Sequence, residues 1–348
     1  MSNWENNIRK VVPYVPGEQP KGNNLIKLNT NENPYGPSPK VKEKALAADA
    51  LRLYPDPAAS DLVAAIAKYH GLSEDRVFVG VGSDDVLAMS FMTFFNSDKP
   101  ILFPDITYSF YDVWADMLRI PYETLPVNDA FEIVPEDYNK QNGGIVFPNP
   151  NAPTGIYMPL ASVRKIVSKN PDVIVIVDEA YIDFGGESAL SMIDEFENLL
   201  VVRTFSKSRS MAGLRIGYAM GNPVLIKYLN DVKYSYNSYT MNRPSIELGV
   251  LSIQDDAYFK ETVEKVIHTR ERFSAGLKEL GFTVLPSSTN FVFASHKKVP
   301  ARELFTGARE RGVIVRYFDK PRIDNFLRIS IGTDEEMDTC LAVLKELL

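Results

Sequence analysis

The chain has 348 residues, of which 45% are apolar and 24% charged, and its formal net charge is −7. This balance is typical of a folded protein with a sizeable core, and a chain of this length tends to divide into more than one core. Acidic and basic residues are interspersed, so the sequence predicts no basic face for nucleic acid. A single cysteine, Cys340, excludes an intrachain disulfide, and three scattered histidines exclude most histidine-based metal sites, so we expect no metal.

The predicted elements begin with an irregular N-terminal arm over residues 1–37, where prolines and glycines forbid long helices. Helical patterns over 38–52 and 59–69 then flank a proline-rich turn that contains Tyr54. The polar start of the arm lacks the apolar region of a signal peptide, and no stretch approaches ~18 consecutive apolar residues. We therefore expect a cytoplasmic protein with no membrane partner.

Short apolar runs alternate with amphipathic segments over the middle of the chain. Alternation of this kind predicts βα units around a mostly parallel sheet that is buried on both faces. We assign residues 38–238 to this large domain. The apolar runs lie at 77–81, 101–103, 145–147, 173–177 and 199–204.

Residues 239–348 are predicted to form a smaller α+β domain. A long helical pattern over 244–280 begins this domain, and another helix ends it. The predicted fold class is therefore α/β, with a mostly parallel central sheet in the large domain and a smaller C-terminal domain. Between its first and last helices, the small domain has predicted strands at 283–285, 291–294, 313–316 and 327–331, and a helix at 301–311.

The strongest local signal surrounds Lys207, in the run Thr-Phe-Ser-Lys-Ser-Arg at 204–209. Lys207 follows an apolar strand, lies among small hydroxyl residues and precedes Arg215 by eight positions. A lysine forms an imine only when its amine sheds a proton, which burial and nearby cations promote. A lysine taken alone is usually a solvated surface residue. This setting instead predicts imine formation beside a bound phosphate.

Three further motifs follow predicted strands. Asp178 ends the strand at 173–177, where open α/β sheets bind ligands, although capping of the next segment explains this residue alone equally well. Gly82 and Ser83 begin a helix whose free N–H groups suit a phosphate. The third glycine of the dinucleotide fingerprint is absent, which argues against a nicotinamide enzyme. The loop Phe-Pro-Asn-Pro-Asn-Ala-Pro-Thr-Gly at 147–155 is clamped by prolines at the same edge of the sheet.

In this order along the chain, the motifs resemble those of fold-type I aminotransferases, which bind pyridoxal phosphate. Within them the chain is similar to the class II, histidinol-phosphate aminotransferase branch. The resemblance covers nearly the whole chain. It also rests on the runs LNTNENPYGPSP at 28–39, YPD at 54–56, DEAY at 178–181 and LRISIG at 327–332.

The resemblance implies a role for each matching residue. Lys207 would hold the cofactor, Asp178 would meet its pyridine nitrogen and Tyr181 its phenolic oxygen, which makes these three the predicted catalytic residues. The ring stacked on the cofactor would be Tyr108. Tyr54 would reach the cofactor phosphate of a neighbouring subunit, so a homodimer with shared active sites is expected. The cofactor phosphate would be held by Ser83, Asp84, Ser206 and Arg215.

One position departs from the family pattern. The family usually has an asparagine directly before Pro-Thr-Gly, where its amide donates to the phenolic oxygen of the cofactor, but this chain has Ala152. Asn151, one residue earlier, is the candidate cofactor contact in this loop. Neighbouring side chains of an extended segment point to opposite sides, so Asn151 need not replace the missing amide.

The implied reaction is ping-pong transamination of L-histidinol phosphate, an amine, with the keto acid 2-oxoglutarate, in histidine biosynthesis. Arg316 and Arg328 are the candidates for the anionic groups of the substrates, because a buried arginine without an anion is costly. Arg316 alone is equally well explained as a solvated residue. Tyr14 of the arm matches a family tyrosine near the substrate phosphate.

Three other functions stay open at this point. An aromatic amino acid aminotransferase and a pyridoxal-phosphate-dependent decarboxylase of amino acid phosphates would share the cofactor residues. A catalytically silent regulator that binds the cofactor would normally carry an additional DNA-binding module, for which the two predicted domains leave no room.

Overall fold

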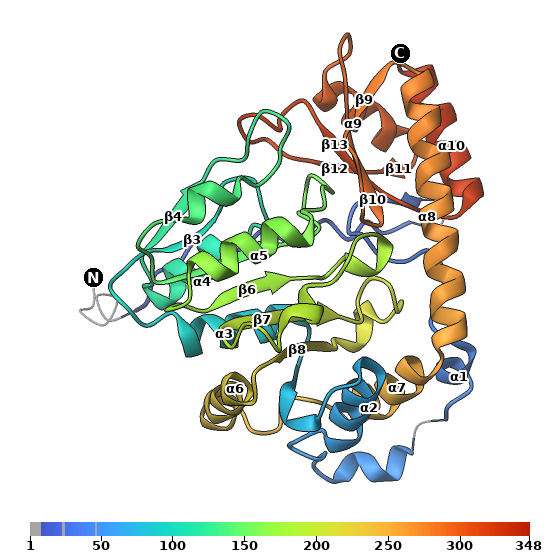
Figure 1. Ribbon diagram of the computed structural model, residues 1–348. Helices are drawn as coiled ribbons and strands as arrows, with labels where there is room; N and C mark the ends of the chain where they lie inside the picture. The colour runs from blue at the N-terminus through green and yellow to red at the C-terminus, as the bar shows by residue number, and fades with distance from the viewer. Residues whose placement is uncertain (1–7, 23–24, 46) are drawn as a thin grey trace, which may run out of the picture.

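The computed structural model describes residues 8–22, 25–45 and 47–348. Its central feature is a seven-stranded sheet with the order β2-β8-β7-β6-β5-β3-β4 (Figure 1). Only β8 runs antiparallel to its neighbours, so the predicted, mostly parallel sheet is confirmed. The strands are β2 (Val77–Gly80), β3 (Ile101–Pro104), β4 (Tyr122–Leu125), β5 (Gly144–Pro148), β6 (Val175–Asp178), β7 (Leu199–Thr204) and β8 (Gly217–Gly221).

Helices cover both faces of this sheet. Val175 and Val177 of β6 face a core shared with α2, α5 and α7, whereas Ile176 faces a second core shared with α3, α4 and α6. This alternation explains why the strand is apolar throughout, because both of its faces are buried. The helices are α1 (Pro39–Lys42), α2 (Ser60–His70), α3 (Ser83–Phe94), α4 (Tyr111–Leu118), α5 (Leu160–Lys169), α6 (Pro223–Tyr236) and α7 (Arg243–Gln254).

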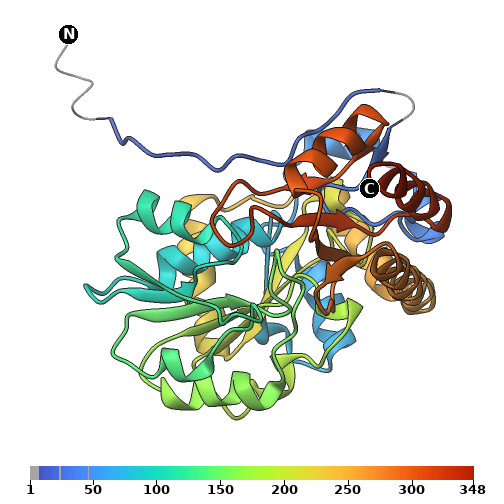
Figure 2. The same ribbon diagram turned by 90° about the horizontal axis from the view of Figure 1, so that it is seen from above.

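A smaller antiparallel unit packs beside the large sheet. Its sheet has the order β12-β13-β10-β9. The N-terminal segment also belongs here, because β1 (Ile26–Lys27) pairs in parallel with β11 (Val313–Ile314) and Leu28 packs in this core. Figure 2 shows residues 8–22 as an extended trace along one side of the molecule. The remaining elements are β9 (Phe282–Val284), β10 (Phe291–His296), β12 (Arg316–Tyr317), β13 (Leu327–Ser330), α8 (Asp256–Glu279), α9 (Ala301–Glu310) and α10 (Asp334–Glu346).

Two predicted helices need correction. The pattern over 38–52 forms only α1 and a 3₁₀ turn at Ala48–Arg52. Among the described residues of these two elements only Val41 is buried, so no apolar face stabilises a longer helix. The pattern over 244–280 is interrupted at Asp255, which separates α7 from α8.

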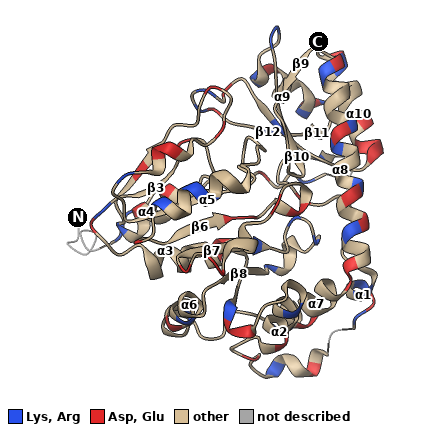
Figure 3. Cartoon of the chain, in the orientation of Figure 1, with Lys and Arg blue, Asp and Glu red and all other residues tan. Residues whose placement is uncertain are grey.

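The interruption at Asp255 also separates two cores. Ile246 of α7 packs in the core of the large sheet, whereas Phe273 of α8 packs in the core of the small unit. Figure 3 shows acidic and basic residues interspersed along α8. It also shows acidic residues, in red, at the end of β6. The predicted division of the chain after residue 238 concerns independent folding units and stays a prediction. Across the described ranges, no helix is both long and apolar enough to cross a membrane.

Candidate active site

A cavity of about 230 Å³ lies at the carboxyl ends of β5, β6 and β7. Pro148 and Asp178 are register partners at the ends of β5 and β6, and Thr204 at the end of β7 leads into the turn that carries Lys207. We call this space the Lys207 cavity. Eight of the predicted cofactor residues line it: Ser83, Asp84, Tyr108, Asp178, Tyr181, Ser206, Lys207 and Arg215.

Asp178 is the buried acid of this cavity, with only 4% of its surface exposed. Its Oδ2 accepts a hydrogen bond of 3.0 Å from the hydroxyl of Tyr111, and its Oδ1 accepts one of 3.2 Å from the backbone N–H of Ala180. Burial raises the pKa of Asp178 to about 7, although both donors act in the opposite direction. A cationic N–H in the cavity would therefore find a strong acceptor here.

Lys207 approaches the cavity from the turn after β7. Its Nζ donates to the backbone carbonyl of Thr30 at 3.2 Å and lies 5.8 Å from the ring centroid of Tyr181. The turn is held from both sides, because Asn33 Nδ2 donates to the Lys207 carbonyl at 3.1 Å and Thr204 Oγ1 accepts from the N–H of Ser206 at 3.1 Å. The amine is thus positioned by rigid backbone.

Two tyrosines stand on the walls of the cavity. The Tyr181 hydroxyl accepts a hydrogen bond of 2.9 Å from Asn31 Nδ2. The Tyr108 hydroxyl donates to Asp84 Oδ1 at 2.7 Å, and burial raises the pKa of Tyr108 well above 10. Tyr108 therefore stays a neutral hydrogen-bond donor at physiological pH.

The anion-binding end of the cavity is built from the start of α3 and from Arg215. Arg215 Nη2 forms an ion pair of 3.0 Å with Asp84 Oδ2 in the first turn of α3. Two glycines permit this close approach. A Cβ on Gly82, whose φ is +88°, would lie 2.5 Å from Arg215 Nη2, and a Cβ on Gly217 would lie 2.2 Å from the backbone of Gly82.

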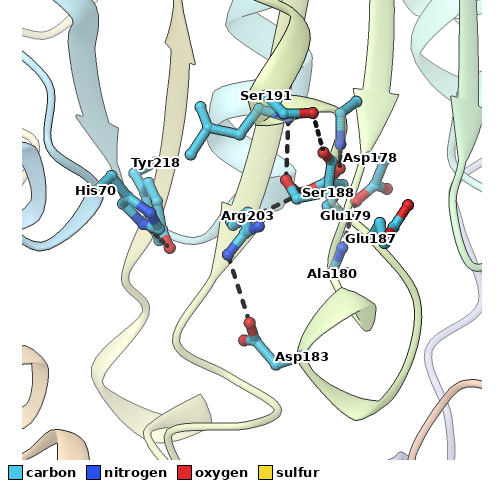
Figure 4. Close-up of polar contacts among 12 residues, drawn as sticks. His70, Asp178, Glu179, Ala180, Asp183, Glu187, Ser188, Ser191, Arg203 and Tyr218 are labelled. Carbon is cyan, nitrogen blue, oxygen red and sulfur yellow. Dashed lines mark hydrogen bonds and ion pairs between the residues drawn. The ribbon is translucent and has the colours of Figure 1, made fainter. Parts of the chain in front are cut away.

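A charge network of Glu179, Arg203 and Asp183 lies beside Asp178 (Figure 4). Glu179, which follows Asp178, accepts from Arg203 Nε at 3.0 Å, and Arg203 Nη1 lies 3.4 Å from Asp183 Oδ1. Asp183 Oδ2 in turn accepts from the hydroxyl of Ser208 at 2.6 Å. Burial acts to lower the pKa of Arg203, but Glu179, Tyr218 and Asp183 together outweigh burial, so the pKa lies above its usual value. Because Ser208 neighbours Lys207, the network connects the end of β6 to the lysine turn.

A second cavity of about 150 Å³, the arginine cavity, adjoins the first. Arg316 and Arg328 are register partners on β12 and β13, and Tyr14 of the N-terminal segment lines the same space. Within the described residues, neither arginine has a carboxylate within 4.0 Å, and the buried Nε of Arg328 lacks a hydrogen-bond partner. The residues common to both cavities are Thr30, Tyr108, Ala152, Tyr181 and Lys207.

Two predicted cofactor residues lie outside the Lys207 cavity. The side chain of Asn151 is used within its own loop, where Nδ2 donates to the carbonyl of Ile106 at 2.9 Å and to Thr154 Oγ1 at 3.1 Å. Ala152 lines the cavity in its place, as alternation along an extended segment requires, so the structure places Asn151 outside the Lys207 cavity. Tyr54 is 78% exposed and packs on Tyr239, with 4.7 Å between ring centroids.

Sequence reasoning missed Tyr111 and Asn31, which bond the predicted catalytic residues Asp178 and Tyr181. It also missed Arg203, which pairs with Glu179 beside Asp178. Asn31 lies inside the run at 28–39, which was matched as a block without a role for this residue. Tyr111 follows Tyr108 by three positions. Its helical spacing predicts only a shared face, and no local pattern relates it to Asp178. In the described part of the chain no cluster of histidine, cysteine and acidic residues could hold a metal ion.

This fold, with its lysine, aspartate and arginine at the strand ends, is that of the fold-type I pyridoxal-phosphate enzymes. Within that class, the chain belongs to the family of class I and II aminotransferases, whose sequence model matches residues 23–344. The family resemblance read from the sequence is confirmed.

Individual relatives agree with this assignment. Histidinol-phosphate aminotransferase 1 of Hydrogenovibrio crunogenus is 52% identical over 99% of this chain and 98% of the relative. The histidinol-phosphate aminotransferase of Sinorhizobium meliloti, crystallised with pyridoxal 5′-phosphate, is 26% identical with a TM-score of 0.84, covering 92% of this chain and 90% of its own. The L-threonine-O-3-phosphate decarboxylase of Porphyromonas gingivalis has a TM-score of 0.78 at 21% identity, covering 92% of this chain and 99% of its own, so it shares the fold alone.

Proposed function

We propose that the protein transaminates L-histidinol phosphate with 2-oxoglutarate by a ping-pong mechanism, in the biosynthesis of histidine. The observation that carries the proposal is the pair Arg316 and Arg328, which have no acidic partner among the described residues and line a cavity that shares Lys207 with the cofactor cavity. Burial also holds the pKa of Arg328 below its usual value, so an anionic ligand would relieve an uncompensated charge. The close relatives that bear the name histidinol-phosphate aminotransferase support this choice.

The residues of the Lys207 cavity fit pyridoxal phosphate. When bound, this cofactor supplies an electron-withdrawing ring that takes up the electron pair of the substrate Cα–H bond. Arg215, Ser206 and the N-terminus of α3 would hold its phosphate, since a guanidinium and free N–H groups both suit phosphate oxygens. The predicted contact from Asp84 would come from its backbone N–H, because its carboxylate already pairs with Arg215 and would repel a phosphate.

The catalytic groups then take distinct positions. Asp178 would accept the proton of the pyridine nitrogen in a hydrogen bond, and Tyr181 would donate to the phenolic oxygen. Tyr108 would stack on the ring. Lys207 Nζ would hold the aldehyde carbon of the cofactor until the substrate amine displaces it, and would then move a proton away from Cα as a general base.

The arginine cavity would bind the anionic end of each substrate in turn. Histidinol phosphate offers a phosphate but no α-carboxylate, whereas glutamate offers two carboxylates. Arg316 and Arg328 would therefore meet a phosphate in one half-reaction and a carboxylate in the other, and Tyr14 would close the site from the N-terminal segment. A guanidinium can form bidentate bonds with either group.

We further propose a homodimer in the cytoplasm. Tyr54 packs on Tyr239, and Tyr236 precedes Tyr239 by three positions in the chain. All three are strongly exposed: Tyr54 at 78%, Tyr236 at 70% and Tyr239 at 45%. Arg243 Nη2 donates to the Tyr54 carbonyl at 3.3 Å, so the tyrosine is presented by a held backbone. Exposed aromatic residues of this kind are enriched at protein–protein interfaces. The single, buried Cys340 thiol suits a reducing compartment.

One experiment separates the proposal from its alternatives. The purified protein is incubated with pyridoxal phosphate and 2-oxoglutarate, and glutamate and CO₂ are measured with histidinol phosphate, histidinol, phenylalanine or threonine phosphate. We expect glutamate to form without CO₂ and histidinol phosphate to be strongly preferred over histidinol. Preference for phenylalanine would establish an aromatic aminotransferase, and CO₂ release from threonine phosphate would establish a decarboxylase.

A further inference from the structure

Tyr111 is the donor closest to the buried acid of the Lys207 cavity. It begins α4, it is 0% exposed, and its hydroxyl donates to Asp178 Oδ2 at 3.0 Å. The ring of Tyr111 is enclosed by other aromatic rings, including Phe103 at 5.9 Å and Trp114 at 6.3 Å between centroids. Such packing leaves the hydroxyl little freedom to choose another partner.

We propose that Tyr111 is a positioning residue, which orients the Asp178 carboxylate and determines how strongly that carboxylate attracts the proton on the pyridine nitrogen of the cofactor. The inference rests on the proposed function and names a part of it that neither the family motifs nor the predicted site includes. Tyr111 would touch neither substrate nor cofactor and would act only through Asp178.

The hydrogen bonds on Asp178 show why the hydroxyl matters. The N–H of Ala180 occupies Oδ1, and the hydroxyl of Tyr111 occupies Oδ2, so each carboxylate oxygen has one protein donor. The two donors fix the plane of the carboxylate and leave lone pairs for a ligand in the cavity. Without Tyr111, Oδ2 would lose its only protein donor among the described residues.

The electrostatic setting gives the direction of the effect. Burial, Asp84 and Glu179 all raise the pKa of Asp178, whereas the donors Tyr111 and Ala180 lower it. The pKa of Tyr111 itself is raised well above 10 by burial and by Asp178, so this hydroxyl donates at every physiological pH. Removing it would make the carboxylate more basic and draw the shared proton away from the pyridine nitrogen.

Tyr138 provides a matched control. It is 1% exposed, and its ring packs on Phe147 of β5 with 6.1 Å between centroids. Its hydroxyl has no hydrogen-bond partner in the described part of the chain. Tyr138→Phe therefore removes a buried hydroxyl that packs against the same sheet without breaking a hydrogen bond. Tyr111→Phe, in contrast, breaks the bond to Asp178.

The test uses the holoprotein loaded with pyridoxal phosphate that carries ¹⁵N in its ring, and records the ring ¹⁵N resonance against pH beside kcat/KM. We expect Tyr111→Phe to move the resonance toward the unprotonated form and to lower kcat/KM roughly ten- to a hundredfold, as loss of a hydrogen bond to a charged group does. Tyr138→Phe should match the wild type. Adding Tyr111→Phe to Asp178→Asn should cause no further change in the resonance.

The outcomes separate this inference from the proposed function. If Asp178→Asn shifts the resonance but Tyr111→Phe leaves it unchanged and lowers only the thermal stability, the hydroxyl is merely structural and the inference is wrong. If the wild type binds no pyridoxal phosphate, or Asp178→Asn leaves the resonance unchanged, the proposed cofactor site is wrong as well. If Tyr111→Phe fails to fold, 3-fluorotyrosine at position 111 retains the shape with a stronger donor, and should move the resonance toward the protonated form; no movement would overturn the inference.

Discussion

Asn31 and Tyr181 are 150 positions apart in the chain, yet Asn31 Nδ2 donates a hydrogen bond of 2.9 Å to the Tyr181 hydroxyl. The rest of Asn31 is equally well held, since its Oδ1 accepts from the hydroxyl of Ser330 at 2.9 Å and its carbonyl accepts from Asn290 Nδ2 at 2.9 Å. An accepted bond on the Tyr181 oxygen leaves its own proton free to point into the cavity. Asn31 therefore supplies an amide in the cavity that Ala152 also lines, where the family usually has the amide of an asparagine at position 152.

The first prediction concerns this amide. Asn31→Ala should raise the pH at which the bound chromophore loses its proton, because the phenolic oxygen of the cofactor would be less stabilised as an anion. Ala152→Asn, which adds a donor, should lower that pH. A spectroscopic pH titration measures both changes. An unchanged titration in Ala152→Asn would mean that Asn31 and Tyr181 already fill the role of the missing amide.

The second prediction concerns the shared active site. Lys207→Ala should be inactive but folded, and Tyr54→Phe should be impaired. If Tyr54 serves the partner's cofactor, a hybrid dimer of the two variants contains one site with both native residues. Mixing the inactive and impaired proteins under conditions of subunit exchange should thus raise activity above the mean of the two. Activity equal to that mean would contradict the shared site. The control for the loss of a lysine is Lys227→Ala, on the exposed face of α6, which should retain wild-type activity.

The third prediction concerns the arginine cavity. Arg328→Ala should lower kcat/KM by on the order of ten- to a hundredfold in both half-reactions, because it removes a charge-assisted bond of about 1.5–3 kcal/mol. Arg328→Lys keeps the positive charge but loses the planar guanidinium that can form two parallel hydrogen bonds, so it should recover only part of the activity. Single-turnover measurements with each amine provide the test. A loss confined to glutamate would show that the phosphate of histidinol phosphate binds elsewhere.

The fourth prediction concerns the network of Figure 4. Arg203→Ala should reduce the free energy of unfolding by about 3–5 kcal/mol, because it leaves Glu179 buried without its cation. The control is Arg302→Ala, which breaks an exposed ion pair with Asp319 and should lower the free energy of unfolding far less, because solvent screens exposed charges. Urea unfolding of both variants gives the comparison. Equal losses in the free energy of unfolding would show that burial of the network contributes nothing to stability.

The fifth prediction is a pH dependence in the cofactor-free protein. Burial raises the pKa of Asp178 from 3.8 to about 7, so between these values the unfolded chain is ionised while the folded protein retains the proton. The stability contributed by this group is therefore full below pH 3.8 and is lost as the pH rises through 7. Asp178→Asn should gain stability relative to the wild type over this range, by about 1.4 kcal/mol for each unit of pKa shift. Parallel stability profiles of the two proteins would contradict the raised pKa.

Local patterns in the sequence determined much of the fold. The strands at 77–80, 101–104, 144–148, 175–178 and 199–204 follow from apolar runs, because a strand buried on both faces must be apolar throughout. The strand β4 was not predicted from the sequence, because Tyr122, Glu123 and Thr124 are exposed and give no apolar run. The glycine-rich β8 was not predicted either, because Gly217 and Gly221 weaken the strand pattern.

The predicted site residues divide in the same way. Lys207, Asp178 and Arg215 could be selected because each lies in a contiguous motif at the end of a strand. The reversal of direction at β8, which brings Arg215 back beside Ser83, is a property of the sheet and not of any short run of residues.

Only the tertiary structure decided which side chains serve the catalytic groups. Asn31 reaches Tyr181 and Tyr111 reaches Asp178 across 150 and 67 positions of the chain. Arg316 and Arg328 meet through the register of an antiparallel pair. Helical and strand periodicities report only on the face that a residue shares with its near neighbours in sequence. Contacts between distant elements depend on how whole sheets and helices pack, and that packing is set jointly by every buried side chain in the core.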